Sequence, residues 1–69
     1  MTRNEALAEY LGSLSSHERH AKMRDIREKL DVSRDVVYNW IAGRTQINRV
    51  FFDEISKIVA VDLSVNVEE

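Results

Sequence analysis

Apolar residues recur three and four positions apart along most of the chain, which is the spacing of an amphipathic helix. The first such stripe consists of Leu7, Leu11 and Leu14. Thr2, followed three residues later by Glu5, has the form of a capping box, a usual start of a helix. The pattern therefore predicts a first helix over about 4–13.

The second stripe predicts a longer helix over about 17–30. Its apolar face consists of Met23, Ile26 and Leu30. Ser15 with Glu18 repeats the capping signature ahead of it. The residues that follow Leu30 then interrupt the pattern, so the helix is expected to end there.

A third, short helix is predicted over about 34–42. Ser33 is a good N-cap, and Asp35 in the first turn suits the positive end of the helix dipole. Gly43 stands where a left-handed C-cap residue belongs. The inward face of this helix consists of Val37, Trp40 and Ile41.

A fourth helix is predicted over about 49–60, after a loop. Its apolar face consists of Phe51, Ile55, Ile58 and Val59. After Val61 the period changes to two, because valine and leucine alternate with polar residues. This alternation predicts an extended tail over 61–69. The tail either pairs as strands across a dimer axis through residues 61–67 or lies over the core.

Length and helical spacing together predict the fold class: one small, compact all-α domain over 1–69, with four helices or five. The chain has 69 residues, of which 43% are apolar and 32% charged, a globular balance. It has no cysteine, which excludes a disulfide scaffold and favours a cytoplasmic protein. No apolar run approaches the ~20 residues of a membrane span, and the first residues do not form a signal peptide.

The most informative stretch covers about 23–43, where the second and third predicted helices meet. Both helices direct apolar side chains inward, and Val32 lies in the turn between them. Two short helices that bury these side chains against each other must cross steeply, which is the helix-turn-helix arrangement. The alternative is an ordinary helix pair, which any small all-helical domain contains.

This stretch resembles the helix-turn-helix of the lambdoid phage repressor and Cro family, and the resemblance covers about residues 18–62. The matching residues are Leu30-Asp31-Val32-Ser33-Arg34-Asp35-Val36-Val37-Tyr38-Asn39-Trp40, Gly43-Arg44-Thr45 and Arg49. Arg27 departs from the family, which usually has a small residue where the two helices approach closely. Asp31 stands where the family usually has glycine, and aspartate tolerates the left-handed conformation better than most residues. The aliphatic stem of Arg27 is expected to lie along the crossing, with its guanidinium in solvent.

At about 100° per residue, the face opposite the buried stripe of the 34–42 helix is polar. It consists of Asp35, Tyr38, Asn39 and Ala42, with Arg34 and Val36 on its flanks. In this motif the N-terminal part of the helix meets base edges in the major groove. The alternative is a solvated helix face, which usually carries such residues.

The resemblance implies base contacts from Ser33, Arg34, Asp35 and Asn39. Arg34 is expected to pair with guanine in bidentate fashion, Asn39 with adenine, and Asp35 with a cytosine amino group. Val36 is expected to touch a thymine methyl group.

Phosphate contacts are expected from Tyr38, Arg44, Thr45 and Arg49. Guanidinium and hydroxyl groups suit phosphate oxygens, and such contacts position the protein rather than read sequence. Lys22 and Arg24 are expected to touch the opposite side, and Tyr38 lies along the protein surface in the alternative interpretation.

The formal charge of −2 opposes DNA binding, but its distribution favours it. Residues 17–49 carry eight basic and five acidic groups, whereas residues 50–69 carry one basic and five acidic groups. The sequence therefore predicts a transcriptional regulator, a repressor-like homodimer on a two-fold symmetric site. The acidic total and Asp35 on the reading face favour the alternative, a protein-interaction module such as an antitoxin-like adaptor.

Catalytic chemistry is not expected from this chain. His17 and His20 lie three residues apart, which is not the spacing of a zinc-protease helix, and no thiolate accompanies them. We therefore predict no enzyme activity, no metal and no cofactor, and the sequence identifies no ligand pocket.

Overall fold

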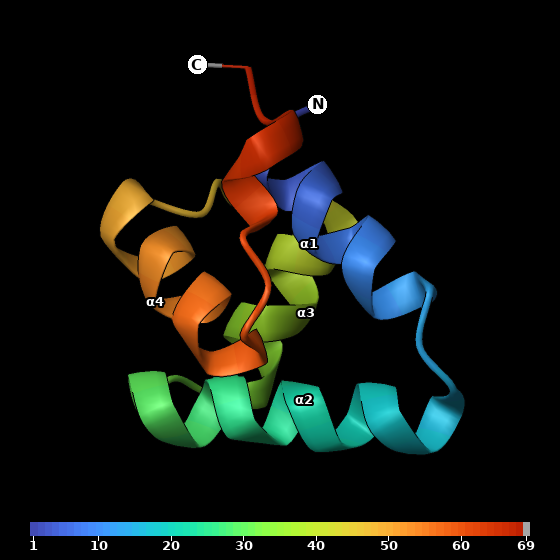
Figure 1. The fold of residues 1–69 in the computed structure, drawn as a ribbon. Coiled ribbons are helices and arrows are strands. Elements are labelled where there is room, and N and C mark those ends of the chain that lie inside the picture. Colours follow the sequence, from blue (N-terminus) through green and yellow to red (C-terminus); the bar gives the residue numbers. More distant parts are fainter. Residues whose placement is uncertain (69) are drawn as a thin grey trace.

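The computed structural model describes residues 1–68 and is helical along most of that length (Figure 1). Its elements are α1 (Arg3–Gly12), α2 (Ser16–Leu30), α3 (Arg34–Ala42), α4 (Arg49–Val59) and the short 3-10 helix η1 (Leu63–Asn66). The described residues contain no strand. The all-α prediction is confirmed, and each predicted helix boundary lies within one residue of the observed one.

Each α-helix begins at a polar side chain that accepts a hydrogen bond from the backbone N–H three residues further along the chain. At α1, Thr2 Oγ1 accepts from the Glu5 N–H at 3.1 Å, and Glu5 Oε1 accepts from the Thr2 N–H at 2.9 Å. Ser15 and Ser33 cap α2 and α3 in the same way, at 3.3 Å each. These bonds satisfy N–H groups that have no partner inside the helix, so the starts of the helices are set locally.

The interior is one continuous apolar cluster to which every helix contributes. Its buried members are Ala6, Leu7, Leu11, Ile26, Val37, Trp40, Ile47, Phe52, Ile55, Val59 and Leu63. Trp40 is 4% exposed, and its indole meets the ring of Phe51 at 5.7 Å between centroids. Such tilted aromatic pairs add to the hydrophobic stabilisation of a core, so Trp40 fixes the inner face of α3.

The turn between α2 and α3 makes the two helices cross steeply, as Figure 1 shows. Asp31 ends α2 in the left-handed conformation, with φ 54° and ψ 46°. The N–H of Val32 then donates to the Arg27 carbonyl at 3.1 Å. The expectation that Asp31 adopts the left-handed conformation in this turn is confirmed.

The predicted extended tail is wrong for Leu63–Asn66, which form η1 (Figure 1). Asp62 Oδ1 accepts from the Ser64 N–H at 3.0 Å and starts this tight turn. Leu63 is 7% exposed and joins the core, while η1 packs against α1. A short alternation of apolar and polar residues describes a 3-10 turn with one buried side chain as well as it describes a strand. Glu69, the last residue of the predicted tail, lies outside the described residues.

None of the helices in residues 1–68 combines the length and the apolar character that crossing a membrane requires.

Candidate nucleic-acid interface

The inner face of α3 is buried and its outer face is exposed, as the pattern predicted. Val37 and Trp40 are 1% and 4% exposed. On the outer side Arg34, Asp35, Tyr38 and Ala42 are exposed, and Asn39 is half-buried. Val36, expected on the flank of this face, is half-buried and packs against the core.

Arg34 and Tyr38 lie one helical turn apart and contact each other. The guanidinium carbon of Arg34 stands over the phenol ring, 5.3 Å from its centroid. A guanidinium in this position is attracted by the ring, so the two side chains restrict each other's rotamers. The sequence predicted a base contact for Arg34 and a phosphate contact for Tyr38, and the structure joins the two residues in one unit.

Asn39 and Arg44 form a second pair, at the other end of α3. Arg44 Nη1 donates to Asn39 Oδ1 at 3.5 Å, and the Arg44 backbone N–H donates to the Asn39 carbonyl at 2.9 Å. Gly43 ends the helix between them with φ 76°, a conformation that favours glycine. The helix end therefore brings a predicted base contact and a predicted phosphate contact together.

Ser33 acts first as the N-cap of α3, because its hydroxyl accepts from the Val36 N–H. The side chain is exposed. Its oxygen is thus held by the helix start, and this bond does not use its hydroxyl proton.

The loop after α3 carries the exposed residues Arg44 and Thr45 and leads to Arg49 at the start of α4. A buried asparagine of α1, 9% exposed, holds this loop in place. Asn4 Nδ2 donates to the carbonyls of Trp40 and Thr45, at 2.8 and 2.6 Å. Asn4 Oδ1 accepts from the Ile47 N–H at 3.3 Å.

Sequence reasoning missed Asn4, although one signal marks it. Asn4 stands three residues before Leu7, in register with the buried stripe of α1. A polar residue in an apolar stripe must find internal hydrogen-bond partners, and here they come from a loop about forty residues away.

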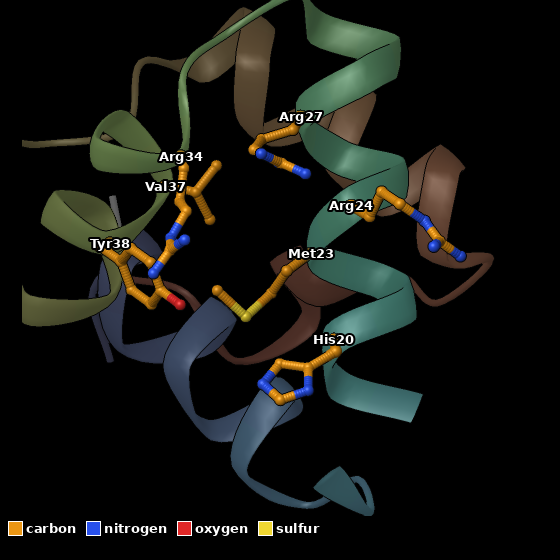
Figure 2. Close-up of a pocket in the computed structure, with 7 residues that line it drawn as sticks. All are labelled: His20, Met23, Arg24, Arg27, Arg34, Val37 and Tyr38. Carbon is orange, nitrogen blue, oxygen red and sulfur yellow. The ribbon is translucent and has the colours of Figure 1, made fainter. Parts of the chain in front are cut away.

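A hollow of about 350 Å³ lies between α2 and α3 and was not expected from the sequence. Its lining consists of His20, Met23, Arg24, Arg27, Arg34, Val37 and Tyr38. Figure 2 shows Arg34 and Tyr38 of α3 opposite Arg27 and Met23 of α2, with the guanidinium of Arg24 turned away. Arg27, whose stem was expected to lie along the crossing, is half-buried and lines this hollow.

The hollow is positively charged. No carboxylate lines it, and neither Arg27 nor Arg34 forms an ion pair with another of the described residues. Lys22 and Arg24, expected at the opposite side of a DNA site, lie on α2, where Lys22 is half-buried and Arg24 exposed.

Comparison with protein-family models, with curated proteins and with solved structures found no significant match.

Proposed function

We propose that this protein is a cytoplasmic transcriptional regulator that binds double-stranded DNA and reads its sequence with α3. The observation that carries the proposal is the two-sided character of this short helix. Trp40 anchors one side in the core, while the other side presents Arg34, Asp35 and Asn39 beyond the steep crossing with α2. A helix held in this way fits the major groove, which is wide enough to admit it.

Base reading rests on the residues near the start of α3 and on Asn39. The Arg34 guanidinium, steadied by Tyr38, suits the O6 and N7 acceptors of guanine. The Asn39 amide suits adenine, and Asp35 accepts from a cytosine amino group. Ser33 donates its hydroxyl proton to a neighbouring acceptor.

Phosphate contacts rest on Arg44, Thr45 and Arg49, with the Tyr38 hydroxyl on the opposite flank of α3. The hydrogen bonds from Asn4 hold the loop, so Arg44 and Thr45 are positioned before DNA arrives. Preorganised cations lose less conformational entropy on binding, which supports this assignment.

A homodimer completes the proposal, because a single short helix reads too few base pairs for a specific site. Residues 61–67 remain the proposed contact. Leu63 is used by its own core, whereas Val61 and Val65 are 43% and 74% exposed and are left to meet a second copy.

A mobility-shift assay with a matched charge control tests the proposal. The double variant Arg34→Ala with Arg44→Ala should abolish DNA retention while circular dichroism remains helical. The control, Lys29→Ala with Lys57→Ala, removes the same charge from exposed positions outside the interface and should retain DNA.

Wild-type retention should also weaken steeply as salt rises, because phosphate contacts release counterions. Equal retention by both double variants would overturn the assignment of α3. Absence of retention even at low salt would favour the alternative, a protein-interaction module, which the net charge of −2 and the exposed Asp35 support.

A further inference from the structure

We infer that the hollow between α2 and α3 binds a small organic phosphate with a flat apolar body, of the size of a mononucleotide. Its volume of about 350 Å³ lies at the lower end of the range for small-molecule sites. The binding itself does not depend on the proposed function. One consequence does rest on it: the ligand and DNA must compete, since both use Arg34 and Tyr38.

The charge of the lining specifies an anion. Arg27 and Arg34 enter the hollow from opposite helices, and no carboxylate is present to neutralise them (Figure 2). A guanidinium presents a planar fork of donors that matches the oxygens of a phosphoryl group. Guanidiniums that line one recess from two helices therefore suit a phosphate ester better than a neutral ligand.

Arg27 contributes a charge that no side chain within residues 1–68 neutralises. It is half-buried and has no acidic partner among the described residues, so an anion in the hollow would provide one. Its guanidinium is therefore available to an anion that enters the hollow.

The apolar part of the lining specifies the rest of the ligand. Met23 and Val37 give the hollow an apolar part of its lining, and the Tyr38 ring lies beside Arg34 (Figure 2). A thioether and an aromatic ring are good neighbours for a flat ring system. Inorganic phosphate uses only the guanidiniums, so it should bind more weakly than a phosphate carried on a ring.

Adenosine monophosphate is a suitable probe, with adenosine and inorganic phosphate as its two halves. In an amide-detected NMR titration, the monophosphate should shift the amide resonances of Met23, Arg27 and Val37 until the site is saturated. Inorganic phosphate should cause the same shifts only at higher concentration, and adenosine should cause almost none. Arg27→Gln should weaken binding at least about tenfold, because it removes a charge-assisted pair. Lys29→Gln, an equal charge change at an exposed position of the same helix, should leave binding unchanged.

Unsaturable shifts, or equal affinity in Arg27→Gln and the wild type, would mean an adventitious ion only and would overturn the inference. A mobility-shift assay with added monophosphate distinguishes a failure of this inference from a failure of the proposed function. The monophosphate should release wild-type protein from DNA, whereas Arg27→Gln should retain DNA and resist release. Loss of DNA retention in Arg27→Gln would place Arg27 among the DNA contacts and overturn the separation of the ligand site from the DNA interface. If the wild type retains no DNA, the proposed function fails while the NMR titration still decides the ligand site.

Discussion

The side-chain amide of Asn4 donates a hydrogen bond to the backbone carbonyl of Trp40 over 2.8 Å, across 36 positions of sequence. The same amide reaches the Thr45 carbonyl, and its oxygen accepts from the Ile47 N–H. One side chain of α1 thereby fixes the end of α3 and the loop that follows it. The proposed phosphate contacts depend on a residue that touches no DNA.

Replacing Asn4 by alanine should lower the free energy of unfolding by about 2–3 kcal/mol, because its buried hydrogen bonds to the backbone of Trp40 and Ile47 are lost. Urea unfolding measures this change. Gln46→Ala, at an exposed position in the same loop, is the control and should cost less than about 0.5 kcal/mol. A loss at Asn4 no larger than that of the control would contradict the role given to the amide.

Ala60 ends α4 in the left-handed conformation, with φ 58°, which is strained for a residue that has a Cβ. Ala60→Gly should therefore stabilise the protein by about 0.5–1 kcal/mol. Ala21→Gly in the middle of α2 should destabilise it by about 1 kcal/mol. The Tm values of the two variants should change in opposite directions from that of the wild type. A lower Tm for both would show that the backbone at Ala60 is not strained.

Glu5 links stability to acid pH through the capping box. Its hydrogen bonds from the backbone and the side chain of Thr2 hold its pKa below the ordinary value of 4.5. The stabilisation is fully present above that ordinary value and is lost as pH falls through the lowered pKa of the folded state. Glu5→Gln keeps an acceptor for Thr2 but does not titrate, so its stability should vary less with pH in that acid range. Glu9→Gln removes the same charge from the same helix outside the capping box and is the control; a steeper or unchanged profile for Glu5→Gln would refute the linkage.

The contact between Arg34 and Tyr38 should be visible in DNA affinity. Tyr38→Phe keeps the ring and should lose about 1.5–3 kcal/mol of DNA-binding free energy, the value of one hydrogen bond to a charged group. Tyr38→Ala also frees the guanidinium and should lose about 0.5–1 kcal/mol more. Fluorescence titration with one duplex compares the variants, and equal affinities for the two would show that the ring does not position Arg34.

The helices could be predicted because their signals are local. Caps such as Ser33, and apolar stripes such as the leucines of α1, act within one or two turns of the chain. The tail could not be predicted, since burial of Leu63 depends on the surface that α1 offers to it.

The candidate site divides in the same way. The outer face of α3 followed from helical rotation, whereas the partner of each side chain did not. The hydrogen bonds of Asn4 and the hollow beside Arg27 each involve residues from different parts of the chain. Their geometry comes from tertiary packing. The sequence marks each only by a residue that breaks a local rule: Asn4 is polar within an apolar stripe, and Arg27 is large at a helix crossing.

Selection of bound sites from random duplexes tests the central claim most directly, since it asks whether α3 reads sequence at all. The wild-type protein at low salt should enrich one short motif, repeated with two-fold symmetry about one helical turn apart. Asn39→Ala should relax the preference at a single base pair of that motif while the rest is kept. A wild-type pool that stays random would contradict the account.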